Sequence, residues 1–215
     1  MSLLLHLDEA AGGTSTVDVS SSPKAVTFAG TSSLASVNTR DTTNNLSVAT
    51  NGYISVAQGA GLITATGDFT IELWFNTSLA AQGTLFYIAG ASSPTSVLFN
   101  RLHVYVGASS SLVFYTESSA RITSGATAFN INTWNHAALT RASGVYMLFI
   151  NGGLIGSYTR TTSVSSTVNP LEIGGFSGGA AGDYMSGWID EVRITNGVAR
   201  YTAAFIPRLQ PYPNS

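Results

Sequence analysis

The segment from Trp134 to Thr159 constrains the fold more than any other part of the chain. Residues 134–141 alternate in character, which is the period of a β-strand, because successive side chains of a strand point to opposite faces. Residues 145–150 are β-branched, aromatic or large and apolar, which is typical of a buried strand. Asn151-Gly152 follows, and this pair favours a type I′ turn because both residues tolerate positive φ. The segment is therefore predicted to form three antiparallel strands joined by two tight turns.

A second segment, DFTIELWFN at residues 68–76, alternates without interruption. One face carries only large apolar side chains, namely Phe69, Ile71, Leu73 and Phe75. The other face carries Thr70, Glu72, Trp74 and Asn76. A strand with one wholly apolar face is typical of the centre of a packed sheet. Short strands recur between Gly, Asn, Ser and Pro turns, with neither heptads nor βαβ spacing. The predicted fold is therefore all-β, a jelly-roll β-sandwich of two antiparallel sheets.

The length and the ends of the chain bound its organisation. At 215 residues the chain fits one domain over residues 1–215, since no linker or internal repeat divides it. Residues 195–215 contain Pro207, Pro211 and Pro213, so this segment is predicted to be an extended C-terminal wrap. The opening MSLLLHLDEAAGG has only a short apolar run before His6, so no signal peptide is expected. No window has the length of a membrane span, so no membrane insertion is expected.

Few charges cover the surface. Charged residues make up 9% of the chain, against about 25% in a typical globular protein. Ser, Thr, Asn and Gly must therefore form much of the surface, which favours a virion or an extracellular protein. The net charge is −2 and Lys24 is the single lysine, so the chain has no means of neutralising a run of phosphates, and no nucleic-acid partner is expected. The absence of cysteine excludes disulfides and thiolate chemistry.

Four segments, in their order and spacing, resemble the laminin G-like domain of the concanavalin A-like lectin/glucanase superfamily. They are NGYISV at 51–56, GDFTIELWF at 67–75, WNH at 134–136 with Asn151-Gly152, and GWIDEVRI at 187–194. The opening LLLHLDE and the closing NGVARYTAAFIP resemble the versions of this domain that are common in phage and environmental sequences. The resemblance implies a concanavalin A-like jelly roll, often with one calcium ion, and often with glycan or protein binding on the concave face or the loops.

The carboxylates do not favour catalysis. Retaining glycoside hydrolases place two carboxyl groups roughly 5 Å apart, and the glucanase relatives carry theirs on a Glu-x-Asp-x-x-Glu strand, which this chain lacks. Glu72 stands alone on its strand, and the adjacent Asp190 and Glu191 are predicted to point to opposite faces. Glu191 and Arg193 are predicted to form an exposed pair. A glycoside hydrolase is therefore the least favoured function, and the chain is not expected to be an enzyme.

Asp190 is the candidate metal ligand. It shares the even positions of its strand with Trp188, Val192 and Ile194, so if that face is the core face, its carboxylate needs a partner there. One reading is a structural calcium ion held by Asp190, backbone carbonyls and Asp8, because Ca²⁺ prefers several oxygen ligands. The alternatives are a cap of backbone N–H groups or a pair with an arginine.

The loop GGFSGGAAGDYMSG at residues 174–187 is the candidate binding loop. It holds Phe176, Asp183 and Tyr184 among glycines, and binding residues are often carried by loops on a rigid scaffold. Sugar rings stack on exposed aromatic faces while placed polar groups bond their hydroxyls. The alternative is a plain connector between strands. His136, which lies beside Trp134, is expected to be a hydrogen-bonded structural histidine, since no Ser or Asp is spaced to form a relay with it.

The sequence therefore predicts a non-catalytic phage virion surface protein. It would be a lectin-like module attached to a capsid or tail, made in the host cytoplasm, with other virion proteins and cell-surface glycans as its partners. The alternative is a purely structural decoration or cement protein of the capsid. The sequence leaves open whether identical chains assemble with one another.

Overall fold

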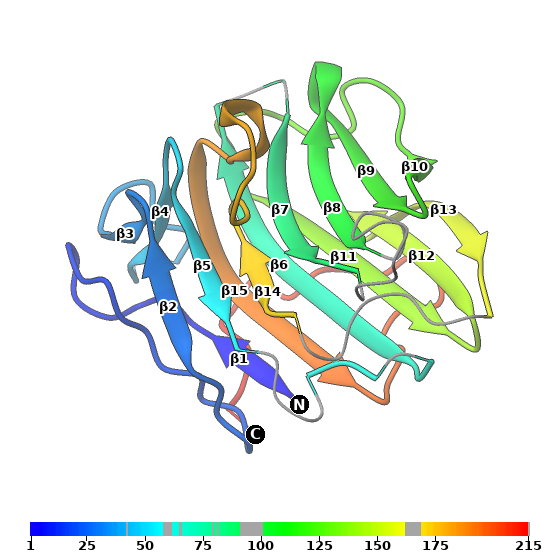
Figure 1. Ribbon diagram of the computed structural model, residues 1–215, viewed down its shortest axis with the longest axis horizontal. Coiled ribbons are helices and arrows are strands. Elements are labelled where there is room, and N and C mark those ends of the chain that lie inside the picture. Colours follow the sequence, from blue (N-terminus) through cyan, green and yellow to red (C-terminus); the bar gives the residue numbers. More distant parts are fainter. Residues whose placement is uncertain are drawn as a thin grey trace.

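The structure is a computed structural model, and it describes the chain except for residues 42, 58–61, 65, 79, 81, 91–100, 162–168 and 215. Two antiparallel sheets face each other, as the sequence predicts (Figure 1). Sheet A has the order β13-β12-β11-β6-β15-β4-β3, with β1 also paired to β15, and sheet B has the order β10-β9-β8-β7-β14-β5-β2. The fold is thus the expected all-β, concanavalin A-like sandwich. No helix in the described part of the chain has the length and apolar character needed to cross a membrane.

The strands of sheet A are β1 Leu3–Leu5, β3 Ser33–Ala35, β4 Asn45–Val48, β6 Phe69–Thr77, β11 Asn135–Ala142, β12 Val145–Ile150, β13 Gly153–Thr159 and β15 Gly187–Asn196. The strands of sheet B are β2 Val26–Ala29, β5 Tyr53–Val56, β7 Gly83–Ile88, β8 Leu102–Gly107, β9 Ser111–Thr116, β10 Ser119–Thr123 and β14 Leu171–Ile173. Two short 3₁₀ turns, η1 Ala108–Ser110 and η2 Ala181–Asp183, complete the elements of the described chain.

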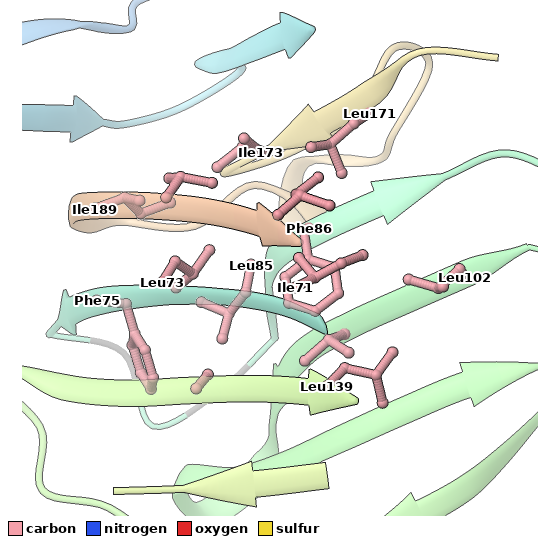
Figure 2. Packing of buried hydrophobic residues seen from close by; sticks show 14 of the residues in the cluster. Ile71, Leu73, Phe75, Leu85, Phe86, Leu102, Leu139, Leu171, Ile173 and Ile189 are labelled. Carbon is pink, nitrogen blue, oxygen red and sulfur yellow. The ribbon is translucent and has the colours of Figure 1, made fainter. Parts of the chain in front are cut away.

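β6 lies at the centre of sheet A, between β11 and β15, as its alternation predicts. Its four large apolar side chains point toward sheet B and are fully buried. Figure 2 shows Ile71, Leu73 and Phe75 of β6 meeting Leu85 and Phe86 of β7 across the gap between the sheets. A single cluster of apolar side chains joins both sheets, and burying such side chains stabilises each by roughly 1.5–3 kcal/mol.

The predicted three-stranded meander is present as β11, β12 and β13. β11 pairs with β12, and β12 pairs with β13. Asn151 and Gly152 both have positive φ, at 49° and 80°, as a type I′ turn requires. Asn151 has a second role, because its side-chain oxygen accepts a hydrogen bond of 2.8 Å from the backbone N–H of His136.

β15 contains a bulge that the sequence does not reveal. Its register with β6 shifts between Asp190 and Arg193, and Glu191 has φ of 50°. A bulge inserts one extra residue and so reverses which face the following side chains occupy. Ile189, Val192 and Ile194 therefore point into the core. Asp190 lies on the outer face opposite Trp74, and the predicted sharing of one face by Asp190, Val192 and Ile194 is wrong.

The chain after β15 has no regular element and lies across the outer face of sheet A, on the side away from sheet B (Figure 1). Phe205 stacks on Tyr201 with ring centroids 3.5 Å apart, and it also meets the Phe149 ring. The backbone N–H of Phe205 donates to the carbonyl of Gly152, with a distance of 3.0 Å. Both faces of sheet A are therefore covered, which explains why every residue of β6 is buried.

Candidate functional site

Glu72 is the centre of a charged cluster beneath the C-terminal tail. Its carboxylate accepts hydrogen bonds from the guanidinium of Arg193 at 2.7 and 2.8 Å. It also accepts from the hydroxyls of Tyr201 and Tyr212, at 2.9 and 3.0 Å. His136 Nε2 lies 3.1 Å from the same carboxylate. Although burial opposes ionisation, the His136 contact and the Arg193 charge lower the pKa of Glu72 to about 2. Glu72 is fully buried and saturated with donors, so it holds the fold together and has no access to a substrate.

Glu191 and Arg193 do not form the exposed pair that the sequence predicts. Both are buried, with 3% and 8% of their surfaces exposed. Arg193 bonds Glu72, while Glu191 bonds His6 and the backbone N–H of Tyr212. The tail contributes to this outcome, because Tyr212 donates its N–H to Glu191 and its ring lies under the Arg193 guanidinium.

Asp190 is paired with an arginine, which was one of the alternatives. Arg40 Nε lies 2.9 Å from Asp190 Oδ2, and the backbone N–H of Glu191 donates to Oδ1 at 2.9 Å. Burial raises the pKa of Asp190 to about 7, although the Arg40 charge lowers it. Asp8 is exposed. These residues do not fit a calcium ion, since Arg40 already occupies the place of the cation, and the described residues contain no group of three His, Cys, Asp or Glu suited to a metal.

The outer face of sheet B differs, because a row of aromatic and polar side chains crosses it. Register places Glu172, Tyr87, His103 and Tyr115 side by side on β14, β7, β8 and β9. Directly paired residues share a face, and their chain neighbours point into the core. The His103 ring lies edge-on to Tyr87, with centroids 5.3 Å apart, and its Nε2 is 2.9 Å from Thr84 Oγ1. Burial lowers the pKa of His103 to about 3, so its ring is neutral at pH 7.

The loop between β14 and β15 folds over one end of this face (Figure 1). Phe176 stacks on Tyr87, with ring centroids 4.4 Å apart. Asp183 accepts the backbone N–H of Ala180 at 2.8 Å and so closes the loop on itself. Tyr184 is 8% exposed and packs 6.4 Å from the Tyr53 ring. Of the three predicted binding residues, Phe176 lies on the aromatic row and is half-buried, whereas Asp183 and Tyr184 shape the loop.

A hollow of about 460 Å³ lies beside the aromatic row. Its lining includes Gln82, Tyr105, Ser111, Val113, Ala120 and Thr123. Small side chains at 107, 108, 111 and 120 leave the space, and the Tyr105 ring forms one wall, 4.8 Å from the His103 ring. The sequence alone does not place Tyr87, Tyr105 and Tyr115 on one face. Pairing between β7, β8 and β9 does so, and pairing of distant strands leaves no local signal.

An aromatic wall, neutral polar side chains and a hollow of this size form a surface suited to a small polar ligand with apolar faces. The chain matches the family model of the concanavalin A-like lectin/glucanases superfamily, laminin G type, over residues 48–200. It belongs to this family. No curated protein matches it.

Solved structures share this fold at low sequence identity. The binding domain of Paraclostridial Mosquitocidal Protein 1 has a TM-score of 0.66 at 16% identity, over 95% of this chain and 49% of that one. Domain 4 of AbnA, an extracellular arabinanase of Geobacillus stearothermophilus solved with arabinotriose, has a TM-score of 0.57 at 17% identity, over 90% of both chains. The sialidase module CBM40 of Ruminococcus gnavus, bound to α2,3 sialyllactose, has a TM-score of 0.52 at 17% identity, over 64% of this chain and 80% of that one. This chain spans about half of the toxin binding domain that it matches.

Proposed function

We propose that the protein is a non-catalytic, lectin-like module that binds glycans on the outer face of sheet B. One observation carries the proposal: a hollow of about 460 Å³ lies next to a row of aromatic side chains on that face. Sugar rings have apolar faces and polar edges, and they suit an aromatic wall bordered by hydroxyl and amide groups. Membership of a lectin/glucanase family and the arabinotriose and sialyllactose of two structural neighbours support the same function.

The absence of catalysis is supported by the state of the carboxylates on sheet A. A retaining glycosidase needs two carboxyl groups roughly 5 Å apart beside the sugar. Glu72, Asp190 and Glu191 are all at most 3% exposed and lie beneath the tail, on the far side of the sandwich from the hollow. Binding without turnover is therefore the proposed activity.

The test is a glycan array followed by calorimetry on the sugars that bind. Replacing Tyr105 with Ala removes one wall of the hollow, so we expect at least a tenfold loss of affinity with the fold intact. Tyr158→Ala is the matched control, because Tyr158 is also half-buried but lies on β13 of sheet A. A variant Y105A that binds as tightly as the wild type would count against this face as the site.

We further propose that the module acts on the surface of a phage virion, attached to a capsid or tail. The likeness of its opening and closing segments to phage sequences and the low charge of the chain support this setting. The check is purification of particles with this chain present at a fixed ratio to the other virion proteins. A blank glycan array together with such a fixed ratio would favour the decoration-protein alternative.

A further inference from the structure

Arg101 stands immediately before β8 on the face that carries the hollow. Its guanidinium lies over the Tyr115 ring, with the guanidinium carbon 4.0 Å from the ring centroid. Its Nε is buried and has no hydrogen-bond partner in the described chain. A buried donor without a partner is unfavourable, and the Nε atoms of Arg121 and Arg141 are in the same state. The other contacts of the guanidinium are what distinguish Arg101.

Arg101 differs from most arginines of the described chain, because no carboxylate or backbone carbonyl is a described acceptor of its guanidinium. Arg40, Arg121, Arg160 and Arg193 each contact a carboxylate. Arg141 and Arg208 bond backbone carbonyls, and Arg200 bonds the hydroxyl of Thr195. Arg101 has no carboxylate within ion-pairing distance among the described residues, and its side chain is hydrogen-bonded to the neutral hydroxyl of Tyr87. Its positive charge is thus not balanced by any described ion pair.

The guanidinium and the hollow lie on the same face of sheet B. Tyr115, on which Arg101 stacks, pairs across the sheet with Ala120, and Ala120 lines the hollow. Tyr105, which also lines the hollow, interacts electrostatically with both Arg101 and Tyr115. The unpaired charge and the hollow are therefore parts of one surface.

We propose that this face recognises a carboxylate-bearing sugar, with the sugar ring in the hollow and its carboxylate on Arg101. The proposal rests on the glycan-binding function proposed above and names the class of glycan. A planar guanidinium presents a rigid pair of donors that matches a carboxylate, and stacking on Tyr115 fixes the plane of that pair. Hydrogen bonds to charged groups contribute about 1.5–3 kcal/mol, which corresponds to roughly a tenfold to hundredfold preference for an acid over its neutral form.

The experiment compares sugars that differ only in charge. Trigalacturonate and its methyl ester form one pair, and 3′-sialyllactose and its methyl ester form a second pair that separates a uronic acid from a sialic acid. Calorimetry on the wild type should give at least tenfold tighter binding of one acid than of its neutral partner. Added NaCl should weaken binding of the acid and leave that of the neutral sugar unchanged.

Two variants of Arg101 assign the preference to this residue. Arg101→Gln should abolish the preference for the acid while affinity for the neutral sugar changes by less than about twofold. Arg101→Lys keeps the charge but not the paired donors, so an intermediate preference is expected. Arg121→Gln is the control, because Arg121 lies on β10 of the same sheet and is already bound to Glu117. It should leave the preference intact.

Equal affinity for acid and neutral sugar in the wild type would overturn the proposal for an acidic sugar and leave the glycan-binding function standing. An equal loss of both sugars in Arg101→Gln, with circular dichroism showing the native fold, would overturn it in the same way. If the wild type binds neither member of either pair nor any sugar on the array, both proposals fail.

Discussion

The two outer faces of the sandwich carry similar kinds of residue and reach opposite states. On sheet A, Glu72 and Arg193 meet, two tyrosine hydroxyls complete the cluster, and the tail excludes water. On sheet B, the Tyr105 ring borders a hollow beside the stacked rings of Tyr87 and Phe176, and Arg101 has no described ion pair. Glu72, Asp190 and Arg193 on sheet A have charged partners within the chain, whereas Arg101 on sheet B has no described ion pair. Paired charges stabilise the fold, and a charge without a charged protein partner is open to a ligand.

The largest expected difference between the faces comes from replacing one glutamate on each. Glu72→Gln leaves Arg193 buried without its counter-charge, and removing one partner of a buried pair typically costs about 3–5 kcal/mol. Glu172→Gln on sheet B should change stability by less than about 1 kcal/mol or raise it, because burial raises the pKa of Glu172 and no described cation faces it. Urea unfolding of both variants measures the difference. Equal losses would mean that the two faces are not distinct in the way described.

Two phenylalanines sharpen the same comparison with a smaller effect. Phe205→Ala removes ring contacts with Tyr201, Phe149 and His136 and loosens the tail, so we expect a loss of about 2 kcal/mol. Phe176→Ala removes contacts with Tyr87 and His103 only and should cost about 1 kcal/mol. Glycan affinity is the second readout, since only Phe176 borders the aromatic row. A loss of affinity in Phe205→Ala and none in Phe176→Ala would reverse the assignment of the two faces.

The two faces should also respond to pH in opposite directions. Glu191, with help from Asn214, raises the pKa of His6 to about 9, so its contribution to stability is present below pH 6.5 and is lost as pH rises through 9. Burial lowers the pKa of His103 to about 3, so its contribution is present above pH 6.5 and is lost as pH falls toward 3.

Melting temperatures measured from pH 3 to 10 check these directions. His6→Gln should flatten the decline above pH 6.5, and His103→Gln should flatten part of the decline below it. Each effect should be a few degrees, because about 1 kcal/mol shifts the melting temperature by about 2–4 °C in a chain of this size. Unchanged slopes in both variants would show that neither histidine is linked to folding in this range.

The smallest expected effect concerns calcium. Arg40 pairs with Asp190, so adding calcium or removing it with a chelator should shift the melting temperature by less than about 1 °C. The matched control is magnesium at the same concentration. A rise of several degrees with calcium alone would support a bound calcium ion at Asp190 and Asp8, which was one of the alternatives drawn from the sequence.

Alternation along one strand could be read from the sequence, and contacts between strands could not. The apolar face of β6 and the turn at Asn151-Gly152 follow from local patterns, and the structure confirms both. The bulge at Glu191 has no local signal, and missing it reversed the face assigned to Val192 and Ile194. The missed bulge left one interpretation of Asp190 intact, because pairing with an arginine was among the alternatives and Arg40 supplies that pair.

Pairing of strands that are distant in the chain accounts for the other contacts that could not be predicted from the sequence. Arg193 and Glu72 are 121 positions apart in the chain, and only the neighbouring positions of β15 and β6 bring them together. The aromatic row has the same origin, since Tyr87, His103 and Tyr115 come from three strands. Residue type suggested that some tyrosines bind a ligand, but only strand order shows which of them share a face.

The tail is fastened to the sandwich at points that follow one another along its length. Phe205 bonds Gly152, the carbonyl of Leu209 bonds Arg40, the N–H of Tyr212 bonds Glu191, and Asn214 bonds His6. A pull applied at the C-terminal end would load these contacts in series, beginning with His6 and ending at the hairpin turn. Each would open in its turn while the sheets stay closed. The tail would thus extend under tension before the outer face of sheet B, on the opposite side, is disturbed.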